Sequence, residues 1–349
     1  MSAQASDTTT TASPPSLLRR IFSGSVGRNL GLVLALVLIL VVGAVTAPNT
    51  FTTVDNMLVI LRQASIIGVI SVGMTFVILS GGIDLSVGSV MGLASVAATL
   101  AAVQDLADSV HWSVMVLIAL ATGLVAGLIN GIVVAYGKVA AFMATLAMMV
   151  GARGLAEIMA QNRTLVISDR GFVRAMNVDL LGVDVLIWIF AVVAIAGWFL
   201  LNRTTFGRRT IAIGGNPEAA RLAGIKVKRH TMWLYAISGL TAGIAAVMIL
   251  GRTTAGTSTH GMLYELDAIA AVVVGGTLLA GGKGTMTGTV FGVLIFATLS
   301  NVFVQNNLSS SVQALAKGVI IVVAVLLQQR FASRPGAADS AAARRASAW

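Results

Sequence analysis

Long runs of apolar residues, separated by short polar segments, account for most of this chain of 349 residues. Each run approaches the ~17–25 residues that an α-helix needs to cross a lipid bilayer. Because a backbone inside lipid must satisfy its own hydrogen bonds, we interpret the runs as helices. The pattern predicts ten of them, over about residues 30–47, 57–79, 85–103, 112–135, 141–161, 183–201, 232–250, 264–280, 285–304 and 311–329.

The composition also indicates a protein that lipid covers. Hydrophobic residues make up 57% of the chain and charged residues only 10%, whereas a soluble domain carries about 25% charged residues. We therefore expect an all-α polytopic membrane protein with its transmembrane domain over residues 29–330. Residues 1–28, rich in Ser, Thr and Ala, are expected to form a disordered tail, and residues 331–349 a second tail.

Basic residues are distributed unevenly between the two sides that ten spans would create. An even number of spans places both termini on one side. Sixteen basic residues fall on that side, and the other side holds only Arg163, Arg170, Arg174 and Arg252. Because positive residues gather in cytoplasmic segments, both termini are expected to be cytoplasmic. Topology thereby explains the net charge of +10, and no nucleic-acid partner is expected.

An internal repeat links two distant parts of the chain. Residues 79–97 match residues 279–297 without gaps, and seven of the nineteen positions are identical, four of them glycine. Glycine is frequent in this chain, so chance is an alternative explanation. In the ten-span topology both copies run inward, turn and run outward, which makes the repeat parallel. Transporters with parallel repeats bind substrate near the repeat interface.

The first copy contains the segment Gly81-Gly82-Ile83-Asp84-Leu85-Ser86. Paired glycines can end one helix and let another begin. Asp84 or Ser86 could then cap the new helix. Alternatively, Asp84 lines an inner gate or a pathway, because an ionisable group near the bilayer is a functional candidate. Both interpretations stay open.

Uncharged polar residues leave a similar choice open. Asn130 in the fourth predicted span would bond either a neighbouring helix or a solute hydroxyl, and the same holds for Gln63 and Ser65 at the outer end of the second span. Arg153 and Glu157 lie four apart on one helix face and are expected to form an ion pair. Small residues four apart predict close helix packing, or surfaces that slide, at Gly88 and Gly92, at Gly123, Gly127 and Gly131, and at Gly284, Gly288 and Gly292.

Residues 202–231 form the longest connection on the predicted cytoplasmic side. Within it Asn216, Pro217 and Glu218 have the pattern of a helix start, and Gly224 supplies a stop. We expect a helix of about two turns with small apolar residues exposed. Such a helix is more typical of a docking element than of a plain connector.

The residue types of an enzyme site are missing from the sequence. The chain has no cysteine and three histidines, so no thiolate or histidine cluster predicts a metal or a nucleophile. The segment around Lys283 departs from the phosphate-binding loop pattern at its first glycine and at its final Ser/Thr. No metal, no cofactor and no ATP hydrolysis by this chain are expected.

Over about residues 55–329 the chain resembles the ribose/xylose-type permeases of ATP-binding-cassette (ABC) sugar importers. The segment from Gly81 to Ser89 looks like that family's signature. The segment from Gly215 to Ile225 is similar to the Glu-Ala-Ala loop of ABC importers. Asn130-Gly131 and the stretch from Phe142 to Leu146 look like the family's fourth–fifth span region, although Ala140-Ala141 replace a frequent proline.

The resemblance implies roles for particular residues. It implies a coupling helix that enters a cleft of an ATPase subunit, formed by Asn216, Pro217, Glu218, Ala219, Ala220, Arg221 and Gly224. It implies a substrate pathway that we expect to include Gln63, Asp84, Ser86, Asn130 and Thr145.

The resemblance also implies an assembly in a bacterial inner membrane. Two permease subunits, identical or homologous, would surround a central pathway, with two cytoplasmic ATPases and an extracytoplasmic sugar-binding protein. Three other classes are weaker candidates: an ABC permease for an amino acid or another solute, an ion-coupled secondary transporter, and a membrane-embedded enzyme. An ion-coupled carrier would use intramembrane carboxylates, and the few candidates here lie toward span ends.

Overall fold

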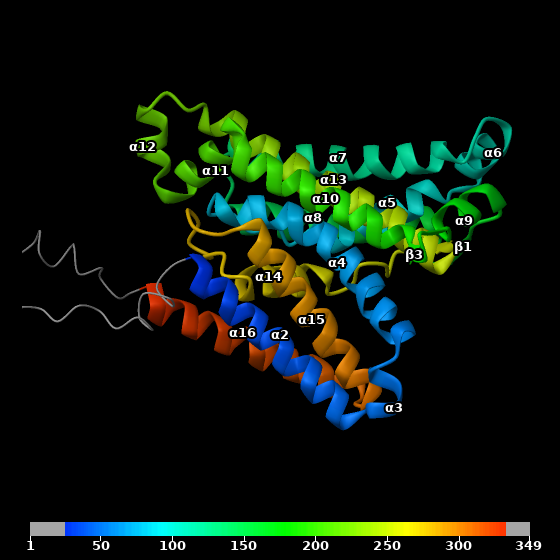
Figure 1. Ribbon diagram of the computed structural model, residues 1–349. Coiled ribbons are helices and arrows are strands. Elements are labelled where there is room, and N and C mark those ends of the chain that lie inside the picture. Colours follow the sequence, from blue (N-terminus) through cyan, green and yellow to red (C-terminus); the bar gives the residue numbers. More distant parts are fainter. Residues whose placement is uncertain (1–24, 333–349) are drawn as a thin grey trace, which may run out of the picture.

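The structure, a computed structural model, describes residues 25–332 and is helical almost throughout (Figure 1). Residues 1–24 and 333–349, and with them most of both expected tails, lie outside the described part. Its helices are α2 (Ser25–Thr46), α3 (Pro48–Phe51), α4 (Val54–Leu79), α5 (Val87–Ala98), α6 (Ala101–Ser109), α7 (Ser113–Ala135), α8 (Ala141–Ala160), α9 (Arg170–Met176), α10 (Val185–Arg203), α11 (Thr205–Gly215), α12 (Pro217–Leu222), α13 (Val227–Thr253), α14 (Tyr264–Val274), α15 (Met286–Gln305) and α16 (Ser310–Ala332).

A helix lies in each of the ten predicted segments, but two segments differ from simple spans. The third is divided into α5 and α6, which are bent by 56° at the break. The eighth ends early, because α14 stops at Val274 and an irregular segment follows. By length and composition six helices of the described part can cross a membrane, or seven if the bent pair counts as one span. The fold is therefore an all-helical, multi-span membrane fold.

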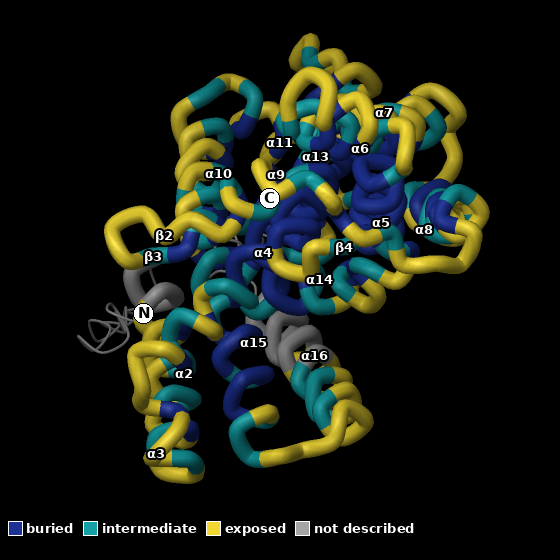
Figure 2. The backbone as a smooth tube through the Cα atoms, turned by 90° about the vertical axis from the view of Figure 1, so that its right-hand side faces the viewer, coloured by how far each residue is buried: buried dark blue, intermediate teal, exposed yellow. Residues whose placement is uncertain are grey.

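Helices α4 and α13 form the centre of the molecule (Figure 2). The most apolar stretch of α13 is 83% buried and that of α4 is 67% buried, against 22% for α8 and for α10. A methyl group on Gly127 of α7 would lie 2.9 Å from the Cα of Gly239 on α13. The glycines of α7 thus allow the close helix contact that their spacing predicted.

The outer helices expose large apolar side chains. Ile158 on α8 is 75% exposed and Ile195 on α10 is 66% exposed. Apolar faces of this size on several helices are covered by lipid or by other protein in a membrane protein. The burial pattern therefore matches the composition: a packed centre of α4, α5 and α13 inside a ring of lipid-compatible helices.

Short strands occur in predicted connections and, for β3, at the start of the predicted span 183–201. Leu165–Val166 (β1) pairs antiparallel with Ala255–Gly256 (β4), and Asp179–Leu180 (β2) pairs with Val183–Asp184 (β3). Both pairs lie at the end of the molecule opposite α12 (Figure 1). They tie the connections at that end together without changing the helical class of the fold.

Candidate functional site

The chain breaks between α4 and α5 as the glycine pair predicted. Gly81 has a φ of +82°, a left-handed conformation that favours glycine. Its amide donates to the Ile78 carbonyl at 2.9 Å, and the Gly82 amide donates to the Val77 carbonyl at 3.0 Å. These bonds satisfy the last carbonyls of α4 and leave Asp84 in an extended segment before α5.

Asp84 is the centre of a buried polar cluster. Its side chain is 1% exposed and accepts hydrogen bonds from the Ser86 amide at 2.9 Å and the Ser86 hydroxyl at 2.6 Å. Its second oxygen accepts from the Ser238 hydroxyl of α13 at 2.8 Å. Asp84 therefore fixes the break to the central helix and is buried inside the protein. The N-cap residue of α5 is Ser86, and its side chain makes no capping bond, so neither predicted cap forms in its standard form.

Two more predicted residues belong to this cluster. The Asn130 amide of α7 donates to the Ser86 hydroxyl at 2.8 Å, and Asn130 is 2% exposed. Thr145 of α8 lies against the break from the other side, with its hydroxyl 3.3 Å from the Ile83 carbonyl. Four helices thus meet at the break through polar contacts.

Gln63, the remaining predicted pathway residue, does not join the cluster. It lies within α4, sixteen residues before the last residue Leu79, or about 24 Å along the helix axis. It is half-buried, and it makes no side-chain hydrogen bond with the described residues. The structure therefore brings together Asp84, Ser86, Asn130 and Thr145 and leaves Gln63 apart from them.

Sequence reasoning missed two residues of the cluster, both on α13. Besides Ser238, the Tyr235 hydroxyl is buried, and a methyl group on Gly82 would lie 2.6 Å from it. It has no hydrogen-bond partner among the described residues. Neither residue has a local signal, because contacts with a segment some 150 positions away leave no periodic pattern.

Helix α12 forms where the sequence predicted the docking helix. The Asn216 side chain accepts from the amides of Glu218 at 3.1 Å and Ala219 at 3.0 Å, and Pro217 is the first helical residue. Gly224 has a φ of +82° and ends the helix. Both predicted boundary signals are confirmed.

Helix α12 extends away from the helical bundle (Figure 1). Leu222 is 82% exposed, and Arg221 pairs with Glu218 at 2.9 Å on the surface. Ala220 is the buried residue of this helix. The helix before it, α11, was not predicted; its N-cap Thr204 accepts from the amides of Phe206 and Gly207.

The end of helix α11 lies against two glycine breaks: the one at Gly81-Gly82 and the equivalent one at Gly281-Gly282, between α14 and α15. The Gly282 amide donates to the Leu79 carbonyl at 2.9 Å, so the two copies of the repeat touch at their equivalent turns. A methyl group on Gly214 would lie 2.5 Å from the Gly282 amide nitrogen and would overlap the Leu79 carbonyl. One on Gly281 would lie 2.8 Å from the Gly81 nitrogen. We call this contact of Gly81, Gly214, Gly281 and Gly282 the glycine junction.

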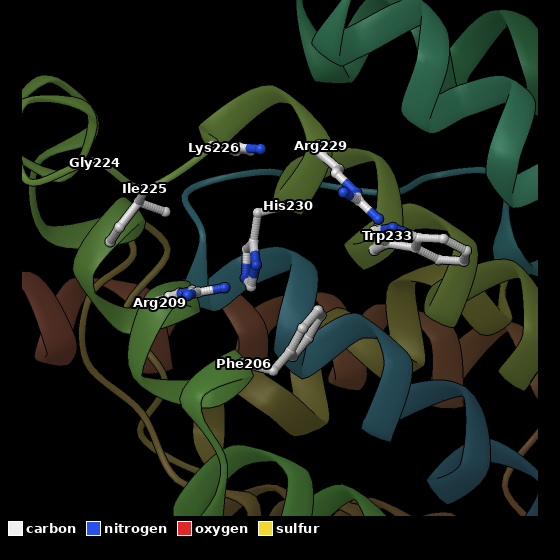
Figure 3. A pocket seen from close by; sticks show the side chains of 8 residues that line it. All are labelled: Phe206, Arg209, Gly224, Ile225, Lys226, Arg229, His230 and Trp233. Atoms are coloured by element: carbon white, nitrogen blue, oxygen red, sulfur yellow. The ribbon is translucent and has the colours of Figure 1, made fainter.

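A basic cavity of about 490 Å³ separates α11 from the start of α13 (Figure 3). Its lining includes the aromatic ring of Phe206, whose centroid lies 4.3 Å from that of His230. The His230 ring bonds the Thr210 hydroxyl of α11 at 2.8 Å. These contacts join α11 to α13, so the helix that reaches the glycine junction is attached to the central helix as well.

Comparison with known proteins assigns this architecture to a family. A family model described as "Branched-chain amino acid transport system / permease component" matches residues 56–327. The chain belongs to this family. Its helical bundle with an exposed α12 is therefore that of a transport permease, and it is a multi-pass protein of a bacterial inner membrane.

Relatives of the family cover most of the chain. The ribose import permease protein RbsC of Haemophilus influenzae is 40% identical over 84% of this chain and 90% of its own length. RbsC of Bacillus subtilis is 40% identical over 89% and 96%. The L-arabinose transport system permease protein AraH of Escherichia coli is 37% identical over 88% and 92%. No solved structure matches the chain.

Proposed function

We propose that this chain is the permease subunit of an ABC importer that moves a monosaccharide of the ribose/xylose class across the inner membrane. The observation that carries the proposal is 40% identity over most of the chain to permeases named for ribose. The family description names branched-chain amino acids, but the relatives named for ribose and arabinose favour a sugar over an amino acid.

The proposal includes partners that supply energy and substrate. The chain would bind cytoplasmic ATPase subunits, which hydrolyse ATP, and an extracytoplasmic sugar-binding protein. A second permease copy or a homologue would complete the pathway. The exposed α12 supports an ATPase partner, because an exposed Leu222 on a capped helix outside the bundle is suited to a cleft in another protein.

We place ten spans in the membrane, with both termini and α12 on the cytoplasmic side. The six or seven helices that qualify by length and composition would be joined by α2, α14 and α16. Helix α14 is too short to span alone, but with the glycine break after it and α15 it parallels α4, its break and α5. The uneven distribution of basic residues supports the orientation.

The glycine junction offers a path from ATP to the membrane interior. A displacement of α12 would move α11 and hence Gly214, which lies against both breaks. The first break holds Asp84, whose bonds reach α5 and α13. We propose that the Asp84 cluster is the gate that this displacement rearranges, and that its polar contacts hold one closed arrangement in place.

The decisive experiment is ATP-driven uptake by the whole transporter in proteoliposomes. The permease is reconstituted with an ABC ATPase and a sugar-binding protein of the same organism, and uptake of ribose, xylose, arabinose and leucine is measured. We expect uptake of a pentose that requires ATP, and none of leucine. Uptake of leucine alone, or sugar uptake that follows an ion gradient without ATP, would contradict the proposal.

A further inference from the structure

A cavity of about 420 Å³ lies between α5, α8 and the segment that enters α14. Arg153, eight residues after Thr145 on α8, lines it, so it lies about 12 Å along that helix from the Asp84 cluster. Its walls include α5 and α14, the helices that adjoin the two glycine breaks. A movement at the breaks would therefore change the shape of this cavity.

Two polar side chains of the cavity are buried without partners. Glu265 is 8% exposed, and its Oε2 has no hydrogen-bond partner among the described residues. Ser89 is 3% exposed, lines the same cavity and makes no side-chain hydrogen bond with the described residues. The buried Glu265 oxygen is costly to leave without a partner, and the Ser89 hydroxyl faces the same cavity, so both are candidates for bonds to a ligand.

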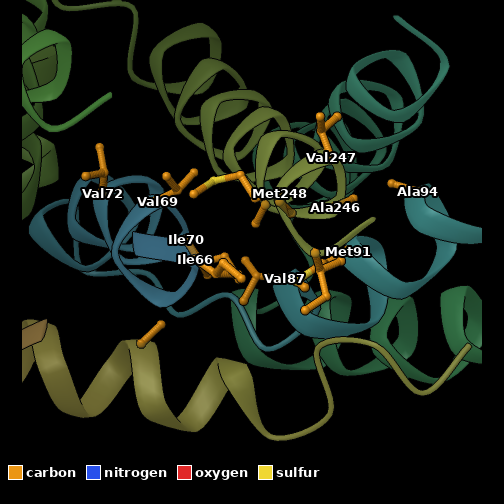
Figure 4. Packing of buried hydrophobic residues seen from close by; sticks show 14 of the residues in the cluster. Ile66, Val69, Ile70, Val72, Val87, Met91, Ala94, Ala246, Val247 and Met248 are labelled. Carbon is orange, nitrogen blue, oxygen red and sulfur yellow. The ribbon is translucent and has the colours of Figure 1, made fainter. Parts of the chain in front are cut away.

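The glycines at positions 88 and 92 make room for the charges of the cavity. A methyl group on Gly88 would overlap the Glu265 carboxylate, and one on Gly92 would lie 2.8 Å from the Arg153 guanidinium. We predicted helix packing at these two glycines, and the structure instead places a loop and two charged groups there. The other face of α5 packs into the core through Val87 and Met91 (Figure 4).

Arg153 is held in place by the chain before α14. Its Nη1 donates to the Ser258 carbonyl and to the His260 carbonyl, the latter at 2.9 Å. The predicted ion pair with Glu157 does not form in the described structure, where Glu157 is exposed. The remaining N–H groups of the guanidinium are free to serve as donors to a ligand in the cavity.

We propose that this cavity is a low-affinity monosaccharide site on the pathway, with Glu265, Arg153 and Ser89 as its polar contacts. The inference rests on the proposed function and adds the residues that would hold the sugar. Sugar hydroxyls both donate and accept, which matches a carboxylate acceptor, a guanidinium donor and a hydroxyl. The apolar side chains of Met149 and Met262 face the same cavity and suit the C–H groups of a sugar ring. The volume lies within the ~300–1,000 Å³ of small-molecule sites.

The two charged groups of the cavity can bond separate atoms of a ligand. The Glu265 carboxylate lies beside Gly88 and the Arg153 guanidinium beside Gly92, two positions one helical turn apart on α5. No ion pair joins them in the described part. The carboxylate can therefore accept from one hydroxyl of a pentose ring while the guanidinium donates to another.

The test measures sugar binding to the permease–ATPase complex in lipid nanodiscs without the binding protein. Saturation-transfer NMR gives the Kd of a pentose and of its monodeoxy analogues for the wild type, Glu265→Gln and Ser89→Ala. Asp55→Asn is the control, because it neutralises an exposed carboxylate of α4 that does not line the cavity. We expect millimolar binding by the wild type and the control, a Kd about tenfold weaker for Glu265→Gln, and about threefold weaker for Ser89→Ala.

The deoxy analogues separate a sugar contact from a structural effect. One analogue should lose about tenfold in affinity for the wild type and less than twofold for Glu265→Gln, since the variant has already lost that bond. Equal loss for every sugar, or an unchanged Kd in Glu265→Gln, would overturn the site, as would wild-type binding of leucine and no pentose. ATP-driven pentose uptake by the wild type is measured in parallel. Uptake without the expected binding pattern would exclude this site alone, whereas absence of uptake would contradict the proposed transport function.

Discussion

At the residue scale, Asp84 has the contacts that matter most. Three donors, from Ser86 and Ser238, point at one buried carboxylate. Hydrogen bonds to a charged group each stabilise by about 1.5–3 kcal/mol, and several of them in a dry interior fix a single geometry. The cluster therefore gives the break one stable arrangement, which is what a gate needs in its closed state.

Two substitutions of Asp84 should lower transport to different extents. Asp84→Asn keeps one acceptor oxygen but loses the charge and the other acceptor, so one serine hydroxyl must turn to accept from the new amide group, and we expect uptake to fall several-fold. Asp84→Ala leaves both serine hydroxyls buried without that acceptor, at about 1–3 kcal/mol for each, and should abolish uptake. Uptake in proteoliposomes and thermal unfolding are measured together. The control Asp55→Asn alters an exposed carboxylate at the other end of α4. Full transport by Asp84→Ala would exclude both a gating and a structural role.

Contacts between residues far apart in the chain could not be predicted from the sequence. Four of the five expected pathway residues meet at one place: Asp84 and Ser86 directly follow the glycine break, and Asn130 and Thr145 contact that break from α7 and α8. Ser238 and Tyr235 were not found, since their contacts are with a segment far away in the chain. The i, i+4 spacing of Arg153 and Glu157 permitted an ion pair, but two carbonyls of a distant loop hold the guanidinium instead.

At the element scale, hydrophobic periodicity predicted where helices occur and failed where they bend. Residues 85–103 carry no charged side chain, and their pattern did not predict the 56° bend between α5 and α6. Helix α11 was not predicted, because its mixture of polar and apolar residues is also typical of a loop. The ends of α12 were predicted correctly from its capping residues, because Asn216, Pro217 and Gly224 act through local backbone geometry.

The contact between α11 and the two breaks predicts an effect of a single methyl group. Gly214→Ala would overlap the Leu79 carbonyl and approach the Gly282 amide, so the end of α11 must shift by a fraction of an ångström. We expect uptake to fall at least tenfold while the variant still inserts and binds the ATPase. Gly215→Ala is the matched control, because its methyl group would meet no atom within 4 Å. ATPase activity and uptake are measured on the same preparation, and equal behaviour of the two variants would refute transmission through Gly214.

The exposed face of α12 predicts where the ATPase binds. Leu222→Ser removes an apolar side chain that is 82% exposed, so the isolated permease should lose little stability. Buried in a partner's cleft, the same leucine would contribute about 1.5–3 kcal/mol, and we expect co-purification with the ATPase to drop about tenfold or more. Leu181→Ser is the control, since Leu181 is 92% exposed in the turn between β2 and β3, at the opposite end. Loss of the ATPase from both variants, or from neither, would contradict docking at α12.

At the scale of the whole molecule, the repeat organises the permease. Two helix–break–helix units, α4 with α5 and α14 with α15, meet at equivalent glycine turns through the bond from Gly282 to Leu79. Thr75 and Thr289 join α4 to α15 at 2.8 Å in the interior. One displacement at the shared turn would act on both units, which makes the junction a suitable point for a coupled movement. The offset of 200 positions found in the sequence thus has a physical counterpart.

The last prediction is the orientation of the protein in the membrane, on which the ATPase contact at α12 and the path from α11 to the Asp84 cluster depend. If sixteen basic residues lie inside and four outside, α12 faces the cytoplasm and the β1–β4 end faces the binding protein. A reporter active only in the cytoplasm, fused after Gly224, should be active, and the same reporter after Asp169 should be silent; a periplasmic reporter should give the reverse. With an odd number of spans between these positions the two fusions must differ. If both report the same compartment, α10 is not a single span, α12 cannot be the ATPase contact, and the path from α11 to the Asp84 cluster loses its source of force.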